Sequence, residues 1–504
     1  MAGLRPVLSE IPRKLVLSRF KFFPSSRVVG EWIARQRTVF PKNAVRFYGF
    51  CTLYGTKIFR IMQSAEANLA IRKTREVNMM KEKLKVGVFG GGRGLTMMNV
   101  LLDHPDARLV AVCDKYQPSL DKVSQMAKEK NADVATYTNF DDFIRHDMDA
   151  VVLANYAHEH ALYAVKCLDA GKHVLSEVLP CGTIAQGVAL IEAVEKSGLV
   201  YAYAENYCYM QHNFEMWYRI KHGDIGDICY AEGEYVHDCT AITPAITYGD
   251  PAHWRNKMSA NFYCTHSLGP MLMSIGHRPV RVVGYELPDF GRSGTLPIFK
   301  GAGGLQMVTL DNGAVCRGLH GNLRREGARN YNYLYYGDSG MMESGRFDNS
   351  PLVNVYHEGE KYCEGTWEQF DPEPRVKLDI DYDKVGHMGS DYYPTHFFIE
   401  KILGRPEGFE WSIDVYQAVE MGICGILAHR SALRGNVPLD VPDLRDKTQR
   451  DAWRNDNETT NPDVPNAQLV PLSSLPTYPY DEEHFYSCVR RLWQDGKRLE
   501  KYPE

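Results

Sequence analysis

The chain has 504 residues and a formal net charge of -5, with 44% hydrophobic and 24% charged residues. This is the composition of a soluble globular protein long enough for two or more domains, and its charge gives no reason to expect nucleic-acid binding. The 12 cysteines form no C-x-x-C pair and no metal-type cluster. We therefore predict reduced thiols in a cytoplasmic protein, and neither a disulfide framework nor a metal site.

The first 82 residues form a basic extension. Residues 1–78 carry 15 Lys and Arg against 4 Asp and Glu. No apolar run there or elsewhere is long enough to span a bilayer, so we predict no membrane span. The extension suits a targeting or membrane-surface segment. The alternative, which we favour, is a translated upstream region before a start at Met79 or Met80, because the fold begins a few residues later, so that 1–82 would not belong to the mature fold.

Apolar strands alternate with helical segments from Leu84 to Ala204. We expect strands at 84–89, 108–113, 149–154, 172–176 and 199–203, and helices at 119–130, 158–170 and 184–197. Near-continuous apolar strands linked by helices are typical of a doubly wound parallel sheet. The pattern therefore predicts an α/β Rossmann domain over residues 83–205.

A glycine cluster follows the first strand. The sequence K-V-G-V-F-G-G-G-R-G covers residues 85–94, a helical pattern begins at Thr96, and the second strand ends at Asp114. Glycines let the backbone approach a pyrophosphate, and a carboxylate about 20 residues on suits the ribose hydroxyls of NAD. Leu95 replaces the third glycine of G-x-G-x-x-G, and a plain βα turn is the alternative. Strand, helix and acid in this order favour NAD.

The pattern changes after residue 206. A helix at 213–222 precedes expected strands at 228–237, 280–287, 305–310, 314–320 and 331–337, with a hairpin-type D-N-G at 311–313. This predicts an α+β domain with a largely antiparallel open sheet over 206–440. We expect a late helix at 412–434 to pack near the first domain. Residues 441–504, rich in proline and polar residues, are expected to form a wrapping tail.

A Rossmann domain followed by an α/β sheet domain resembles the Gfo/Idh/MocA oxidoreductases. Residues 171–177, G-K-H-V-L-S-E, look like that family's G-K-H-V-x-x-E. The family usually continues with a lysine that assists proton transfer to or from the substrate hydroxyl. Val178 stands at that position here, which argues against the chemistry of an ordinary sugar dehydrogenase.

A narrower branch, the NAD-dependent glycosidases of glycoside hydrolase family 109, also carries E-V at this point. Over residues 84–435 the chain is similar to that branch in E-N-Y-C-Y at 205–209, A-E-G-E-Y-V-H-D at 231–238, W-R at 254–255, Y-C-T-H-S-L-G-P at 263–270, G-H-M-G-S-D at 386–391 and D-V-Y-Q-A at 414–418. The resemblance implies a carbohydrate substrate and a homo-oligomer. It also implies a redox-neutral cycle: oxidation of the sugar C3 hydroxyl by NAD+, elimination of the anomeric substituent, addition of water and reduction of the ketone.

The resemblance also assigns site residues. The cofactor positions are Arg93, Gly94, Asp114, Asn155, His158, Glu177, Val178, Asn206 and Tyr263, with Gly90 and Gly92 completing the glycine loop. The substrate positions are Tyr235, Arg255, Tyr263, Thr265 and His266. For catalysis we predict His266 and His237 as proton carriers, because imidazole exchanges protons near neutral pH, and Tyr235 and Tyr209 as hydrogen-bond donors.

Structural interpretations remain open for several of these side chains. The alternatives are a turn residue for His266, a satisfied pair with Asp238 for His237, a packing aromatic for Tyr209, a surface ion pair for Arg255, and helix capping for His158, His387 and Asp391. Two other functions also remain open. One is an ordinary NAD-dependent sugar or polyol dehydrogenase in which histidine or tyrosine replaces the lysine, and the other is a non-enzymatic NAD- or sugar-binding protein.

Overall fold

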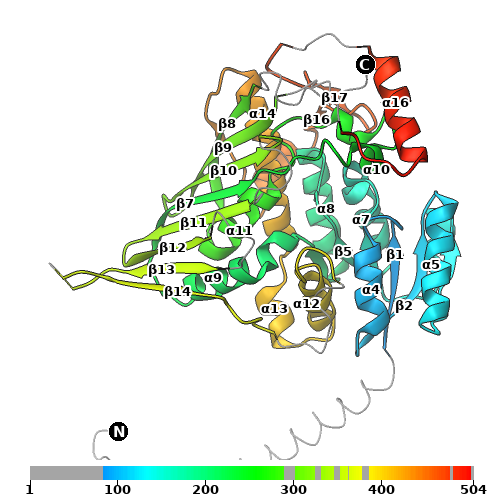
Figure 1. Cartoon of the computed structure of the whole chain (residues 1–504), viewed down its shortest axis with the longest axis horizontal. Helices are drawn as coiled ribbons and strands as arrows, with labels where there is room; N and C mark the ends of the chain where they lie inside the picture. The colour runs from blue at the N-terminus through cyan, green and yellow to red at the C-terminus, as the bar shows by residue number, and fades with distance from the viewer. Residues whose placement is uncertain are drawn as a thin grey trace, which may run out of the picture. The chain divides into compact units, whose positions relative to one another are not determined.

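Two sheets, with helices packed between them, dominate the computed structural model (Figure 1). It describes residues 83–288, 301–323, 331–345, 352–360, 363–376, 385–476 and 481–500. These belong to one compact unit that begins at Lys83, so the prediction about the basic extension lies outside the described residues. Within the described part, no helix is both long and apolar enough to cross a membrane.

The first sheet is the predicted Rossmann sheet. Its six strands are all parallel, in the order β3-β2-β1-β4-β5-β6. They are β1 (Leu84–Phe89), β2 (Ala107–Cys113), β3 (Ala135–Tyr137), β4 (Ala150–Leu153), β5 (His173–Ser176) and β6 (Tyr201–Tyr203). The strand order reverses between β1 and β4, and ligands of such sheets bind in the crevice at this switch point.

Helices cover both faces of the parallel sheet. They are α4 (Leu95–Asp103), α5 (Gln117–Glu129), α6 (Phe140–Phe143), η2 (Ala157–Glu159), α7 (His160–Asp169) and α8 (Ile184–Ser197). Met97 of α4 and Leu120 of α5 share one core with the β-strands, and Ala164 of α7 and Ile191 of α8 belong to another. The structure confirms the predicted bounds of α8, because the Thr183 hydroxyl caps its first turn and Gly198, at φ 64°, ends it.

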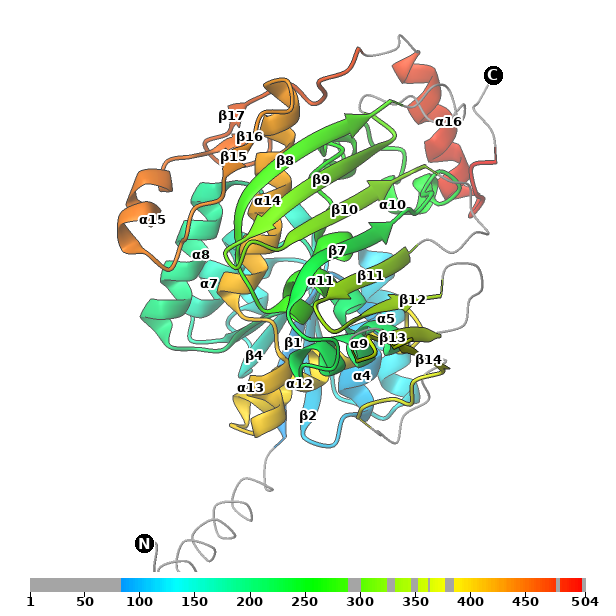
Figure 2. The ribbon, with the colours of Figure 1, turned by 90° about the vertical axis from the view of Figure 1, so that its left-hand side faces the viewer.

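The second sheet has nine strands in the order β14-β13-β12-β11-β7-β10-β9-β8-β15. They are β7 (Ile228–Tyr235), β8 (Pro279–Leu287), β9 (Gly303–Leu310), β10 (Val315–Gly321), β11 (Tyr331–Gly337), β12 (Gly340–Ser344), β13 (Val353–His357), β14 (Thr366–Phe370) and β15 (Leu439–Asp440). Figure 2 looks onto this sheet. Only β7 and β10 pair in parallel, so the predicted, largely antiparallel sheet is confirmed.

Helices of the second domain connect the two sheets. They are η3 (Asn206–Tyr209), α9 (Gln211–Lys221), α10 (Thr243–Thr247), η4 (Trp254–Lys257), α11 (Thr265–Ile275), α12 (Tyr392–Ile402), α13 (Pro406–Trp411) and α14 (Val415–Leu433). A capping box formed by Asp414 and Gln417 starts α14, which then packs against α8 of the first domain and β8 of the second (Figure 1).

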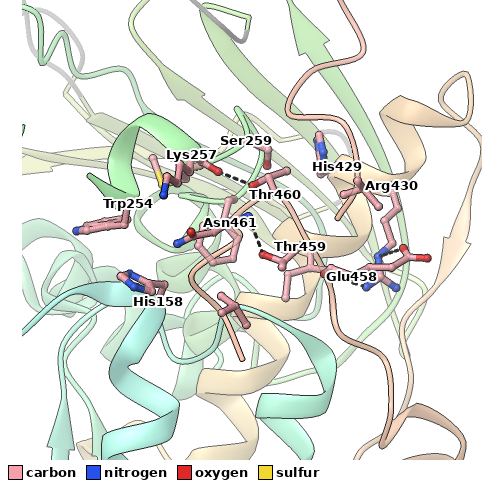
Figure 3. A pocket seen from close by; sticks show the side chains of 16 residues that line it. His158, Trp254, Lys257, Ser259, His429, Arg430, Glu458, Thr459, Thr460 and Asn461 are labelled. Atoms are coloured by element: carbon pink, nitrogen blue, oxygen red, sulfur yellow. Dashed lines mark hydrogen bonds and ion pairs between the residues drawn. The ribbon is translucent and has the colours of Figure 1, made fainter. Parts of the chain in front are cut away.

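The C-terminal segment then crosses both domains through α15 (Lys447–Trp453), β16 (Glu458–Thr459), β17 (Gln468–Leu469) and α16 (Glu482–Gln494). Arg430 of α14 pairs with Asp456 at 2.7 Å, and Lys257 pairs with Asp463 at 2.8 Å. This segment helps to line a cavity of about 30 Å³. Figure 3 shows its lining side chains, which include His158 and Trp254 on one side and Arg430 on the other. The cavity has room for ordered water and not for a sugar.

Candidate active site

The loop at Gly90–Gly94 joins β1 to α4 and has the geometry of a dinucleotide loop. A Cβ at Gly90, where φ is +110°, would lie 2.3 Å from the Ala154 carbonyl oxygen, and a Cβ at Gly94 would lie 2.3 Å from the Gly90 oxygen. Side chains are therefore excluded at both positions. The backbone N–H of Gly91 donates to Oδ2 of Asp114 at 2.5 Å, which holds the carboxylate at the mouth of the loop, as predicted for ribose recognition.

Polar atoms beyond the carboxyl end of β4 also fit a bound dinucleotide. Oδ1 of Asn155 and Nδ1 of His158 are buried and have no hydrogen-bond partner among the described residues. Buried polar groups without partners are uncommon in native proteins. An NAD molecule lying across the switch point would bring hydroxyl, amide and phosphate groups to this edge. The residues present thus fit NAD.

A buried carboxylate organises the wall beside this crevice. Arg93 donates to Oδ1 and Oδ2 of Asp391, each at 2.8 Å, and lies 2.7 Å from Oε1 of Glu177. Asp391 also accepts from Nδ2 of Asn206 at 2.8 Å and contacts Nδ1 of His387 at 2.9 Å. Burial opposes the ionisation of Asp391, but the hydrogen bonds and charges of Arg93 and His387 outweigh it and lower the pKa of the carboxyl.

Asp391 is a functional candidate for which the sequence left helix capping and a site role open. It precedes α12, yet its side chain caps no backbone N–H of that helix. The residues before it, His387, Met388 and Gly389, have φ values of 55°, 58° and 86°. This left-handed turn is strained for two non-glycine residues and brings His387 back onto Asp391. The G-H-M-G-S-D motif was the available signal.

His266 is held by a second buried carboxylate. Its Nδ1 lies 2.6 Å from Oε1 of Glu205, which is 0% exposed at the end of β6. Because a carboxylate accepts, Nδ1 carries the hydrogen and Nε2 remains for proton exchange. The rings of Tyr207, Tyr235 and Tyr263 surround the imidazole at centroid distances of 4.3, 4.7 and 5.1 Å. Sequence reasoning assigned no role to Glu205, although a proton-carrying histidine needs such a partner.

Tyr235 and His237 form a second polar pair on the same wall. The Tyr235 hydroxyl and Nδ1 of His237 are 2.9 Å apart. Burial raises the pKa of the Tyr235 phenol well above its ordinary value, so the hydroxyl stays protonated. Oδ1 of Asp238 accepts from the backbone N–H of Thr240 at 2.9 Å. The contact with Tyr235 places His237 beside the other candidate catalytic groups.

Most of the predicted site residues meet around one cavity of about 330 Å³, the size of a small-molecule site. The predicted residues that line it are Arg93, Glu177, Val178, Asn206, Tyr235, His237, Arg255, Tyr263 and His266. The Arg255 guanidinium lies 4.5 Å from the ring centre of Trp254 and 5.6 Å from that of Tyr263. The cavity thus joins the end of the cofactor crevice to acid–base side chains of the second domain.

Comparison with known proteins agrees with this arrangement. Residues 84–205 match the sequence model of the Gfo/Idh/MocA oxidoreductase family, which has an NAD-binding Rossmann fold. The matched segment coincides with the Rossmann domain. The predictions of an enzyme and of NAD as its cofactor agree with this family.

Curated relatives of this chain include proteins named as glycosidases. A glycosyl hydrolase family 109 protein of Saccharopolyspora erythraea is 25% identical over 393 residues, covering 72% of this chain and 83% of the relative. An alpha-N-acetylgalactosaminidase of Shewanella oneidensis is 26% identical over 226 residues, covering 42% of this chain and 49% of the relative.

Solved structures share the fold. An oxidoreductase domain protein from Kribbella flavida has a TM-score of 0.57 and 17% identity, covering 71% of this chain and 99% of that one. A levoglucosan dehydrogenase solved with NADH and L-sorbose has a TM-score of 0.56 and 19% identity, covering 72% and 100%.

Two predicted site residues lie in the core and not at the cavity. Thr265 is 0% exposed and its hydroxyl accepts from the Tyr203 hydroxyl at 3.4 Å, so the predicted substrate contact is corrected to a packing role. Tyr209 is also 0% exposed, and its hydroxyl donates to the Trp411 carbonyl at 2.6 Å. The predicted catalytic role of Tyr209 is therefore replaced by the packing alternative. His158 lines the small cavity of Figure 3.

Proposed function

We propose that this protein hydrolyses a glycoside through transient oxidation of the sugar at C3. The observation that carries the proposal is the Glu205–His266 pair at 2.6 Å, whose imidazole lies on the cavity wall. Val178 lines the same cavity, at the position where the resembling dehydrogenases have a lysine. The similarity to proteins named glycosyl hydrolase family 109 supports the same reaction class. We further propose that the protein acts as a homo-oligomer.

His266 is the proposed base. Bound NAD supplies reversible hydride transfer, which makes the C3 hydroxyl a ketone and later restores it. A C3 ketone acidifies the hydrogen on C2, and Nε2 of His266 removes that proton. The Glu205 carboxylate stabilises the imidazolium that forms. When the C1–O bond breaks, its electron pair leaves with the aglycone oxygen, and C1 and C2 become doubly bonded.

The Tyr235–His237 pair is the proposed acid. Its two groups, 2.9 Å apart, relay a proton to the departing oxygen. Water then adds at C1 and gives one proton to the Tyr235–His237 pair, which restores the acid, while His266 returns a proton to C2. Arg255 and Asn206, both on the cavity wall, are available to hold ring hydroxyls. The C3 hydroxyl releases its proton to the solvent when the hydride leaves and regains a proton when the hydride returns, so one glycoside and one water give a free sugar and an alcohol.

An ordinary NAD-dependent sugar dehydrogenase is the second candidate. The same His266–Glu205 pair could take the proton of the oxidised hydroxyl directly, and this would replace the missing lysine. The two functions differ in whether NADH accumulates.

The test is a panel of nitrophenyl glycosides given to the purified protein with NAD+, while nitrophenol and NADH absorbance are recorded together. Nitrophenol without net NADH is the expected result, and the His266→Ala variant is the matched control for background hydrolysis. Stoichiometric NADH without nitrophenol would replace the glycosidase with the dehydrogenase.

A further inference from the structure

The C-terminal helix α16 packs beside α10 of the second domain in both views of the molecule (Figures 1 and 2). Phe485, Tyr486 and Val489 of α16 form a small core of their own with Leu499. Nη2 of Arg490 donates to the Gly249 carbonyl at 3.1 Å, and the Leu499 backbone N–H donates to the Ala241 carbonyl at 3.0 Å. The helix is therefore anchored on the second domain.

One end of α16 reaches the adenosine side of the cofactor crevice. The ring of Trp493 lies 6.2 Å from that of Tyr116 and 5.4 Å from that of Tyr248. Tyr116 follows Asp114 by two residues, and its backbone N–H donates to Oδ1 of Asp114 at 2.8 Å. Because the adenine base is attached to the ribose that Asp114 is placed to bind, these rings lie where the base would be.

These three rings, which we call the aromatic group (Tyr116, Tyr248 and Trp493), offer open surface at that point. Tyr116 is 48% exposed and Tyr248 is 38% exposed. Large aromatic rings gathered at a surface mark a binding site, and purine bases stack on such rings.

The other end of α16 reaches the cavity that holds the candidate catalytic residues. Phe485 and Tyr486 line it together with Arg93 and Glu177. Phe485 and Trp493 are eight residues apart, which at 1.5 Å per residue spans about 12 Å of helix. One helix therefore runs along the cofactor crevice from the cavity to the adenosine side.

We propose that α16 is part of the cofactor site, with Trp493 and Tyr116 holding the adenine base of NAD and the helix retaining the bound dinucleotide. Exchange of the dinucleotide then requires α16 to leave the crevice. Slow exchange suits a reaction that restores NAD+ in every cycle. The inference rests on the NAD site and not on the hydrolytic step, so it survives if the reaction proves to be a simple dehydrogenation.

The test measures binding in the full chain without any glycoside. Titration and stopped-flow displacement of NADH, followed by its fluorescence, give the Kd and the dissociation rate. Trp493→Ala is expected to raise both about tenfold, a change of about 1.4 kcal/mol in binding. Trp493→Phe should retain most of the affinity. Trp367→Ala is the matched control, because that ring is 67% exposed on β14 and contacts Tyr356.

Reduced nicotinamide mononucleotide separates the adenine contact from general damage. It lacks the adenosine half, so Trp493→Ala should leave its Kd unchanged within about twofold while weakening NADH. Equal weakening of both ligands, or unchanged NADH binding, would overturn the proposal. If Trp493→Ala does not fold, Tyr116→Ala provides the same comparison from the Rossmann domain. This substitution does not change the residues that pack the core of α16.

Discussion

Removing the charge of Asp391 should destabilise the protein because the half-buried Arg93 would lose its fully buried counterion. Asp391→Asn keeps the shape of the side chain but removes the carboxylate that Arg93 contacts twice at 2.8 Å. Breaking a buried ion pair on one side costs about 3–5 kcal/mol. Glu177, 2.7 Å from Arg93, remains as a second counterion, so we expect the lower end, about 3 kcal/mol.

The matched control is Asp147→Asn. Asp147 also lies 2.8 Å from a cation, Lys85, but it is 86% exposed, so solvent screens this pair. Thermal unfolding followed by circular dichroism measures both variants. At about 2 °C per kcal/mol for a large domain, Asp391→Asn should lower Tm by about 6 °C, and Asp147→Asn should lower it much less. Equal shifts in the two variants would refute the reasoning about the buried network.

Three further predictions concern the site and the core. His266→Ala should lower kcat by about 10²–10⁴-fold while the Kd for NADH changes less than about twofold, and an unchanged kcat would remove His266 from the mechanism. Tyr209→Phe should leave kcat unchanged within about twofold but cost about 1 kcal/mol of stability in urea unfolding, whereas a large loss of kcat would restore its catalytic role. Burial lowers the pKa of His104 and His396, which lie 3.1 Å apart, to about 4. In the unfolded chain the pKa of histidine is about 6.5, so between pH 4 and pH 6.5 the unfolded chain binds more protons than the folded protein. The free energy of unfolding should therefore fall as the pH drops from about 6.5 toward 4. His396→Gln should lose less stability than the wild type between these pH values in urea unfolding, and an equal loss would contradict the assignment.

The Rossmann half could be predicted because its signals are local. Strands such as Ala150–Leu153 are buried on both faces and read as continuous apolar runs, and α8 carries a hydroxyl cap and a terminal glycine. In the second domain α11 escaped prediction because Gly269 and Pro270 lie inside it, and both residues normally interrupt helices. Strand β14 was missed because it is largely exposed at the sheet edge and has little apolar periodicity. Strands β12 and β13 alternate in burial, but each has only five residues, which is short for a reliable pattern.

The sequence predicted a site residue only where a local motif identifies it and the fold also directs its side chain into the site. Asp114 and His266 could be predicted because each lies in a short motif that by itself indicates the function of the residue. The partnership of Arg93 with Asp391 spans 298 residues, and that of His266 with Glu205 spans 61, so only the fold brings them together. Thr265 and Tyr209 show the opposite case, because a motif residue can face the core as readily as the cavity.

Hydrolysis in deuterium oxide tests the central claim most directly. The nitrophenyl glycoside that the protein cleaves best would be turned over in this solvent and the released sugar analysed by NMR. His266 removes the C2 proton, exchanges it with the solvent while the aglycone leaves, and returns a deuteron, so we expect deuterium at C2. The original hydrogen stays at C3 because the hydride is returned. A released sugar with only protium at C2 would contradict elimination through a C3 ketone.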